Sequence, residues 1–156
     1  MTIQVTRKHV AVGGVAAVLA LAAGIVAHFE GLRHDPYKDV IGVLTVCYGH
    51  THGVEDRTYT QAECDALMQG DLAQADAAVR RCIPEAPGPV EAALVSATYN
   101  IGPRVVCGST IQKRAQAGDW KGVCDGLLAW KYAGGKVSPG LLNRRSAERD
   151  LCLQGV

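Results

Sequence analysis

The feature that most constrains this chain is an unbroken apolar segment near its N-terminus. Residues Val10 to Ala27 are 18 consecutive apolar or glycine positions, and Arg7 and Lys8 precede them. A run of this length predicts one helix of roughly 27 Å, close to the roughly 30 Å hydrocarbon core of a bilayer. The preceding positive charges favour a cytoplasmic N-terminus, with the remainder of the chain exported.

The same segment is only weakly hydrophobic. It contains seven alanines and three glycines, and only eight larger apolar residues. At about 0.3–0.6 kcal/mol for each larger residue, insertion into a membrane gains only ~2–5 kcal/mol. Three interpretations stay open at this point: a cleaved signal peptide, a stable transmembrane helix, or a segment that enters the membrane and later leaves it.

Six cysteines are many for a chain of 156 residues, a length that favours one domain. None forms a CxxC pair, which argues against a zinc ribbon or a thioredoxin-type motif. We therefore expect a disulfide framework in an oxidising compartment, although six buried thiols in a cytosolic core stay an alternative. The expected bonds are Cys47–Cys64, Cys107–Cys124 and Cys82–Cys152.

The net charge of the chain does not favour a nucleic-acid partner. Lys plus Arg number 16 and Asp plus Glu number 15, so net charge gives no reason to expect nucleic-acid binding. His50 and His52 lack an obvious third ligand for a metal. We expect no metal, no cofactor and no nucleic acid.

The pattern of the remaining chain predicts an α+β fold. Thr60 and Glu63 form a capping box that starts a helix, and a cluster of prolines and a glycine ends it after residue 83. Alternating residues over 43–48, between Gly42 and Gly49, predict a small hairpin sheet. We expect a mainly helical lobe beside a small antiparallel β-lobe, with a cleft between them. Further helices are expected over 90–101, 110–117, 119–130 and 141–153.

The stretch EGLRHDPYKDVIGVLTVCYGHT, which begins at Glu30, carries the candidate chemistry. It places carboxylates at Glu30 and Asp39 and a hydroxyl at Thr45. We expect Glu30 at the C-terminal end of the first helix, a turn formed by Gly31 and Pro36, and Thr45 on the hairpin. Two carboxylates that face one cleft are what glycoside hydrolysis requires: one is a protonated acid, and the other stays ionised.

This spacing resembles the active-site signature of the phage-type lysozymes, glycoside hydrolase family 24. In that signature a Glu is followed after eight residues by an Asp, and after five more by a Thr, as at Glu30, Asp39 and Thr45. The resemblance implies a lysozyme-like fold and an inverting muramidase. Glu30 would be the general acid, Asp39 would position or activate water, and Thr45 would help to hold that water. Inversion requires carboxyl groups ~6.5–9.5 Å apart.

The similarity continues through four more segments and so covers nearly the whole chain beyond residue 28. It implies that His50 and Asp71 form a structural pair, and that Asn100 and Arg144 contact the glycan. The segments are TYTQAECDALMQGDL (58–72), ALVSATYNIG (93–102), STIQKRAQAGDW (109–120) and YAGGKVSPGLLNRRSAERDLC (132–152).

Glu30 lies three residues after Ala27, so cleavage within the apolar segment would shorten the helix that carries it. This arrangement resembles the signal-anchor-release endolysins. It implies an uncleaved segment over 1–28, a muramidase domain over 29–156, export to the periplasm as a monomer, and transient inner-membrane association through 10–27. We hypothesise that the cleft cannot form until the segment leaves the bilayer. Two rivals stay open: a lytic transglycosylase and a non-catalytic peptidoglycan-binding module.

Overall fold

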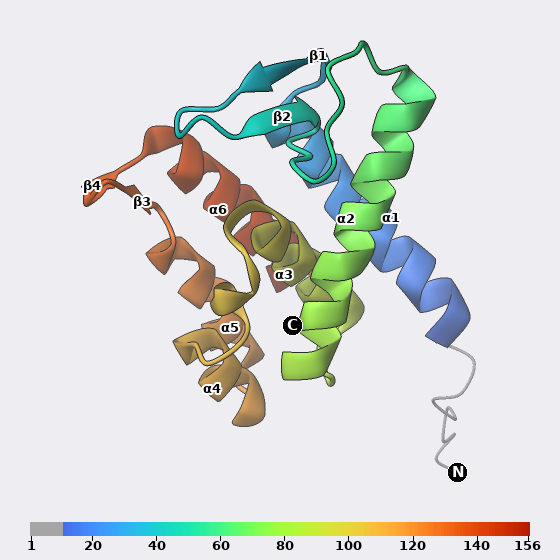
Figure 1. The fold of residues 1–156 in the computed structure, drawn as a ribbon. Coiled ribbons are helices and arrows are strands. Elements are labelled where there is room, and N and C mark those ends of the chain that lie inside the picture. Colours follow the sequence, from blue (N-terminus) through green and yellow to red (C-terminus); the bar gives the residue numbers. More distant parts are fainter. Residues whose placement is uncertain (1–10) are drawn as a thin grey trace.

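The computed structural model describes the backbone of residues 11–156 and the side chains from residue 14 onward. Six α-helices and two short hairpins form two lobes within this part of the chain (Figure 1). The helices are α1 (Ala11–Glu30), α2 (Gln61–Cys82), α3 (Gly88–Ile101), α4 (Thr110–Gln116), α5 (Trp120–Gly126) and α6 (Pro139–Leu153). The strands are β1 (Arg33–Lys38), β2 (Leu44–Cys47), β3 (Tyr132–Ala133) and β4 (Lys136–Val137), and the 3₁₀ turns are η1 (Pro103–Val105) and η2 (Leu127–Ala129).

The helix α1 packs against the helical lobe. Val18, Ala22 and Val26 are spaced four residues apart, which places them on one face, and they are 3%, 0% and 0% exposed. This face contacts α3 and, less extensively, α2, while Leu21 on another face is 44% exposed. The predicted apolar helix is confirmed as far as Glu30, where it ends at Gly31 with a left-handed φ of 69°.

The predicted membrane segment begins at Val10, which lies outside the described residues. Within the range that the structure does describe, no helix combines the length and the hydropathy needed to cross a membrane.

The helix α3 is the centre of the helical lobe. Every residue from Val90 to Thr98 except Glu91 is buried. The helices α1, α2 and α6 all pack on it. Pro89 in its first turn starts the helix, because a proline there loses no internal hydrogen bond. The helix therefore forms the wall against which the residues of α1 and α6 are placed.

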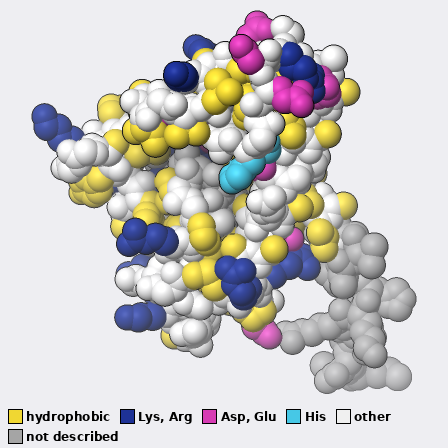
Figure 2. All heavy atoms as spheres, viewed as in Figure 1, with side chains coloured by type: hydrophobic (Ala, Val, Ile, Leu, Met, Phe, Trp, Pro, Cys, Tyr) yellow, Lys and Arg dark blue, Asp and Glu magenta, His cyan; other side chains and the backbone are white. Residues whose placement is uncertain are grey.

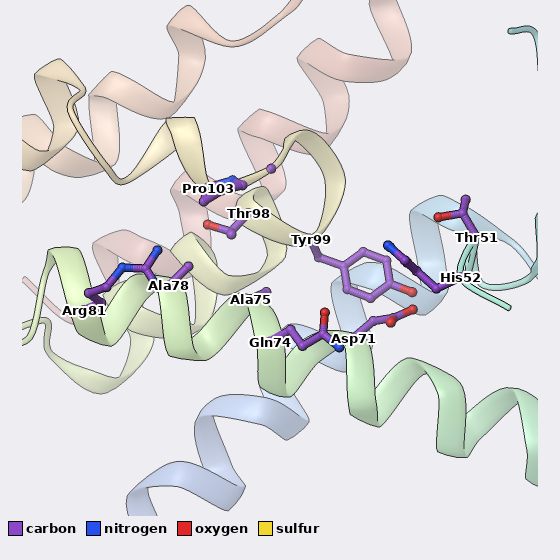
Figure 3. Close-up of a pocket in the computed structure, with 12 residues that line it drawn as sticks. Thr51, His52, Asp71, Gln74, Ala75, Ala78, Arg81, Thr98, Tyr99 and Pro103 are labelled. Carbon is purple, nitrogen blue, oxygen red and sulfur yellow. The ribbon is translucent and has the colours of Figure 1, made fainter. Parts of the chain in front are cut away.

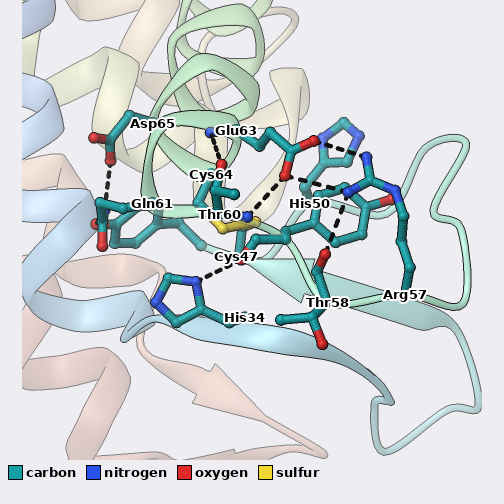
Figure 4. Close-up of a disulfide and its surroundings, with 12 residues drawn as sticks. His34, Cys47, His50, Arg57, Thr58, Thr60, Gln61, Glu63, Cys64 and Asp65 are labelled. Atoms are coloured by element: carbon teal, nitrogen blue, oxygen red, sulfur yellow. Dashed lines mark hydrogen bonds and ion pairs between the residues drawn. A yellow bond between two sulfur atoms is a disulfide. The ribbon is translucent and has the colours of Figure 1, made fainter.

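The β-lobe has its own small core of Val46, Cys47, Tyr59 and Cys64. The capping box predicted at Thr60 is confirmed, and the Cys47–Cys64 disulfide joins β2 to the first turn of α2 (Figure 4). The lobe is thus fixed covalently to the helix that also borders the helical lobe.

The hairpin differs in part from the prediction. Strand β2 lies where alternation placed it, but its partner β1 includes Pro36, so the predicted turn at Pro36 is wrong. The pairing is irregular between Arg33 and Tyr37, and an irregular edge strand tolerates a proline. The chain instead turns at Val40–Gly42, after Asp39. A second hairpin, β3–β4, turns at Gly134 and Gly135, both with positive φ, as a two-residue hairpin turn requires.

Only one of the three expected disulfides is confirmed. The other two are wrong, because the bonds are Cys82–Cys107 and Cys124–Cys152. Cys82 ends α2 beside the turn that follows η1, and Cys124 on α5 faces the last turn of α6. These partners depend on how the helices pack together.

Candidate active site

Glu30 occupies the last position of α1, with its carboxylate between two other elements. Its Oε1 accepts a hydrogen bond of 2.6 Å from Nη1 of Arg144 on α6. A Cβ at Gly49, which follows β2, would lie 3.2 Å from Glu30 Oε2. Gly49 has a φ of +83°, so both its backbone conformation and this close approach require glycine. Glu30 therefore lies where the β-lobe meets the helical lobe.

Asp39 lies at the turn of the first hairpin, and the turn orients its carboxylate. Its Oδ1 accepts hydrogen bonds from the backbone N–H groups of Ile41, at 3.0 Å, and Val43, at 2.8 Å. Its Oδ2 has no hydrogen bond within residues 14–156, so that oxygen is available to bind water.

Thr45 lies on β2, opposite Tyr37 of β1. The residue is 4% exposed, and its hydroxyl donates a 3.0 Å hydrogen bond to the Val43 carbonyl. This fixes the rotamer and leaves the hydroxyl oxygen able to accept a hydrogen bond. Asp39 and Thr45 thus come from one hairpin, and Val43 contacts both.

His50 and Asp71 form the pair that the sequence predicted. His50 Nδ1 lies 2.7 Å from Asp71 Oδ2 on α2, and Nε2 lies 2.6 Å from the His52 carbonyl. Both ring nitrogens therefore face oxygen acceptors. Nearby, the Tyr99 hydroxyl on α3 donates a 2.6 Å hydrogen bond to the Tyr48 carbonyl. These contacts join the segment after β2 to both α2 and α3.

A cavity of about 440 Å³ lies between these elements. It is visible as a hollow between the lobes with histidine at its rim (Figure 2). Its lining side chains come from α2, α3, η1 and the segment after β2 (Figure 3). Gly49 belongs to both the cavity and the surroundings of Glu30, so the carboxylate lies beside one end of the cavity. The lining residues are Gly49, Thr51, His52, Asp71, Gln74, Ala75, Ala78, Arg81, Thr98, Tyr99, Gly102 and Pro103.

The surroundings of Tyr99 shift the pKa of its phenol. Burial raises the pKa of its phenol above the ordinary value, and the negative charges of Asp71 and Glu30 raise it further. Tyr99 therefore stays a neutral hydrogen-bond donor at the cavity wall. In Figure 3 its ring points toward Asp71 and His52.

Arg144 and Asn100, the two residues predicted to contact the glycan, both bind charged side chains of the protein. Arg144 is 3% exposed, and its guanidinium binds Glu30, Glu148 and the Ser96 carbonyl; its contact with the glycan stays a prediction. Asn100 is partly buried, and its Oδ1 accepts a 2.9 Å hydrogen bond from Arg145; its contact with the glycan also stays a prediction. In both cases the contact satisfies a buried guanidinium group, which needs hydrogen-bond acceptors.

Sequence reasoning missed the buried charges of α6 and the role of Gly49. Arg144, Arg145 and Glu148 share a helix at spacings of three and four residues, which is the spacing of side chains that interact. That pattern is also typical of an exposed helix, so only burial distinguishes the two cases. The signal that could have pointed to Gly49 is its place in the turn that follows the strand carrying Thr45.

Metal ligands do not cluster in the part of the chain that the structure describes. No three His, Cys, Asp or Glu side chains come together there as a metal site requires.

Comparison with known proteins gives a consistent result. The family model described as phage lysozyme matches residues 27–148. A SAR-endolysin of Bacteriophage PS119 is 45% identical over 144 residues, covering 90% of this chain and 86% of that protein. A SAR-endolysin of Enterobacteria phage P21 is 41% identical, covering 96% of each. The crystal structure of the active form of P1 phage endolysin Lyz, 26% identical, superposes with a TM-score of 0.81 over 92% of this chain and 93% of that one.

Proposed function

Because the chain belongs to the phage lysozyme family, we propose that it hydrolyses the β-1,4 bond between N-acetylmuramic acid and N-acetylglucosamine in bacterial peptidoglycan, and so lyses the host cell. The observation that carries this proposal is the position of Glu30. The carboxylate lies at the junction of the two lobes, where Arg144 binds it, and beside a cavity of about 440 Å³.

In the proposed mechanism Glu30 is the general acid. It donates a proton to the oxygen of the leaving sugar, which must happen as positive charge develops on the other ring. Its place at the end of α1 leaves it 21% exposed, enough to reach a substrate while the helix holds its backbone.

Asp39 and Thr45 act on the water. The turn presents the free Oδ2 of Asp39, and the Thr45 hydroxyl oxygen is free to accept a hydrogen bond from the same water. Activation of water from the opposite side of the ring inverts the anomeric carbon. We therefore assign an inverting reaction to this enzyme, which acts as a monomer without metal or cofactor.

The remaining residues support the two lobes. The His50–Asp71 pair and the Tyr99 hydrogen bond join the β-lobe to α2 and α3, so they keep the cavity open at a fixed width. Their role is structural, through charge-assisted and buried hydrogen bonds.

Export and activation are part of the proposal. Three disulfides fit an oxidising compartment such as the periplasm. The apolar segment over 10–27 first tethers the chain to the inner membrane, where the face of α1 that buries Val18, Ala22 and Val26 cannot contact α3. Release lets α1 dock on α3 and brings Glu30 to Arg144, so activity follows release.

The test is digestion of purified sacculi by the wild type and Glu30→Gln, with Glu85→Gln as a matched control on the exposed loop before α3. The proposal predicts new reducing ends from the wild type and the control, and almost none from Glu30→Gln. Anhydro-muropeptides would instead identify a transglycosylase, and equal rates for the wild type and Glu30→Gln would end the assignment. The anomer formed first, followed by NMR, decides inversion against retention.

A further inference from the structure

Three charged residues on α6 are buried in the core. Arg144, Arg145 and Glu148 are 3%, 0% and 0% exposed. An arginine stays protonated in a protein, so a buried guanidinium needs an anionic or strongly polar partner. Glu30 is one such partner of Arg144, and Arg145 needs a partner of its own to compensate its positive charge.

Glu148 balances it and contacts both arginines. Its Oε1 accepts hydrogen bonds from Arg144 Nε at 3.2 Å, Arg145 Nη2 at 3.0 Å and Ser96 Oγ at 2.7 Å. Its Oε2 lies 2.8 Å from Arg145 Nε, although without the angle of a hydrogen bond. One carboxylate therefore fixes the position of two guanidinium groups.

The same contacts reach Glu30. Arg144 is bound by Glu148 at Nε and by Glu30 at Nη1, so the position of one end of the guanidinium determines the other. Arg145 also interacts electrostatically with Glu30. With Glu30 protonated, Arg144, Arg145 and an ionised Glu148 carry a net charge of +1, and without Glu148 that charge would be +2.

We propose that Glu148 is a positioning residue for Glu30: it orients Arg144 and cancels the charge of Arg145, so that Glu30 can hold the proton it donates. This inference rests on the proposed role of Glu30 as the acid. Without Glu148, two uncompensated guanidinium groups would favour the ionised form of Glu30, which has no proton to give.

Burial and the neighbouring charges act in opposite directions on Glu148 and Arg145. Burial raises the pKa of Glu148, while Arg145, Ser96 and Arg144 act in the opposite direction. Burial also lowers the pKa of Arg145, and the charge of Glu148 opposes that shift. Burial has the larger effect, so the pKa of Glu148 stays above its ordinary value and that of Arg145 stays below its own, and the opposite charge of each group limits the shift of the other.

The test compares pH–rate profiles of sacculus hydrolysis for the full chain and its Glu148→Gln variant, scaled to the folded fraction. The variant keeps the shape and the acceptor oxygen but removes the charge. We expect the alkaline limb, where the acid has lost its proton, to move down by ~1 pH unit, with an approximately tenfold lower rate on that limb. Glu91→Gln removes a partly buried carboxyl of the helical lobe that also binds an arginine, and it is the matched control, with the limb unmoved.

A second variant keeps the proposal testable if Glu148→Gln does not fold. Arg145→Gln removes a positive charge and should move the alkaline limb in the opposite direction, to higher pH. Opposite shifts cannot come from a general loss of stability. Limbs that coincide with the wild type in the folded variants would overturn the proposal. If Glu30→Gln retains full activity, the proposed function itself fails, which is a different result.

Discussion

The packing of α1 makes a prediction about two residues on the same helix. Val26 is fully buried against the helical lobe, whereas Leu21 is 44% exposed on another face. Val26→Ala removes two methyl groups and Leu21→Ala removes more carbon. If burial decides the effect, the smaller truncation will cost more stability.

The magnitude follows from the buried surface. At about 0.8 kcal/mol for each buried carbon, plus a term for the cavity left behind, Val26→Ala should lower the free energy of unfolding by roughly 2–3 kcal/mol. Leu21→Ala should cost less than about 1 kcal/mol, because much of its side chain already contacts water.

Urea unfolding followed by far-UV circular dichroism measures both values, provided that the slopes of the two transitions match. Hydrolysis of sacculi over a temperature series adds a functional readout, because undocking of α1 also removes Glu30 from Arg144. Val26→Ala should lose activity at lower temperature than Leu21→Ala. Equal stabilities, or the reverse order, would refute the packing of α1 on the helical lobe.

Two further predictions concern Glu91 and Gly49. Burial and the neighbouring Asp76 raise the pKa of Glu91 from its ordinary value of 4.5 to about 7. Between these two pH values the folded state holds a proton on Glu91 that the unfolded state has released. Stability should therefore fall by on the order of 2–3 kcal/mol as pH rises from about 4.5 to about 7, and urea midpoints should show that Glu91→Gln lacks this part of the slope. Gly49→Ala should reduce hydrolysis roughly tenfold or more, because the added Cβ displaces Glu30. Gly53 also has a positive φ, but a Cβ there would meet no atom within 4 Å, so Gly53→Ala should lower stability without lowering the activity of the folded protein. Equal losses of activity in the two variants would contradict this prediction.

Local signals in the sequence predicted local structure well. Thr60 and Glu63 identified the start of α2, because a capping box needs only four consecutive residues. The apolar run identified a helix that continues to Glu30, and the alternation over 43–48 identified β2. These elements carry two of the three residues expected to react, so the outline of the site was available before the fold.

Features that depend on packing were not predictable in this way. Strand β1 has the sequence RHDPYK, which lacks both alternation and β-branched residues, and forms because β2 offers it a partner. The Cys124–Cys152 bond depends on α5 meeting α6. Glu148 resembles a surface residue in sequence, and only the assembled core shows that it is buried. In each case a contact distant in sequence decided the outcome.

We propose that the helix that ends at Glu30 cannot lie in the bilayer and also carry Glu30 to its place in the helical lobe. The most direct measurement is the specific activity of the full chain on sacculi in two fractions of the same cells, one held in the inner membrane and one released after the membrane potential is dissipated. The account predicts that the released fraction generates reducing ends and the membrane fraction generates almost none. Equal specific activity in the two fractions would contradict it.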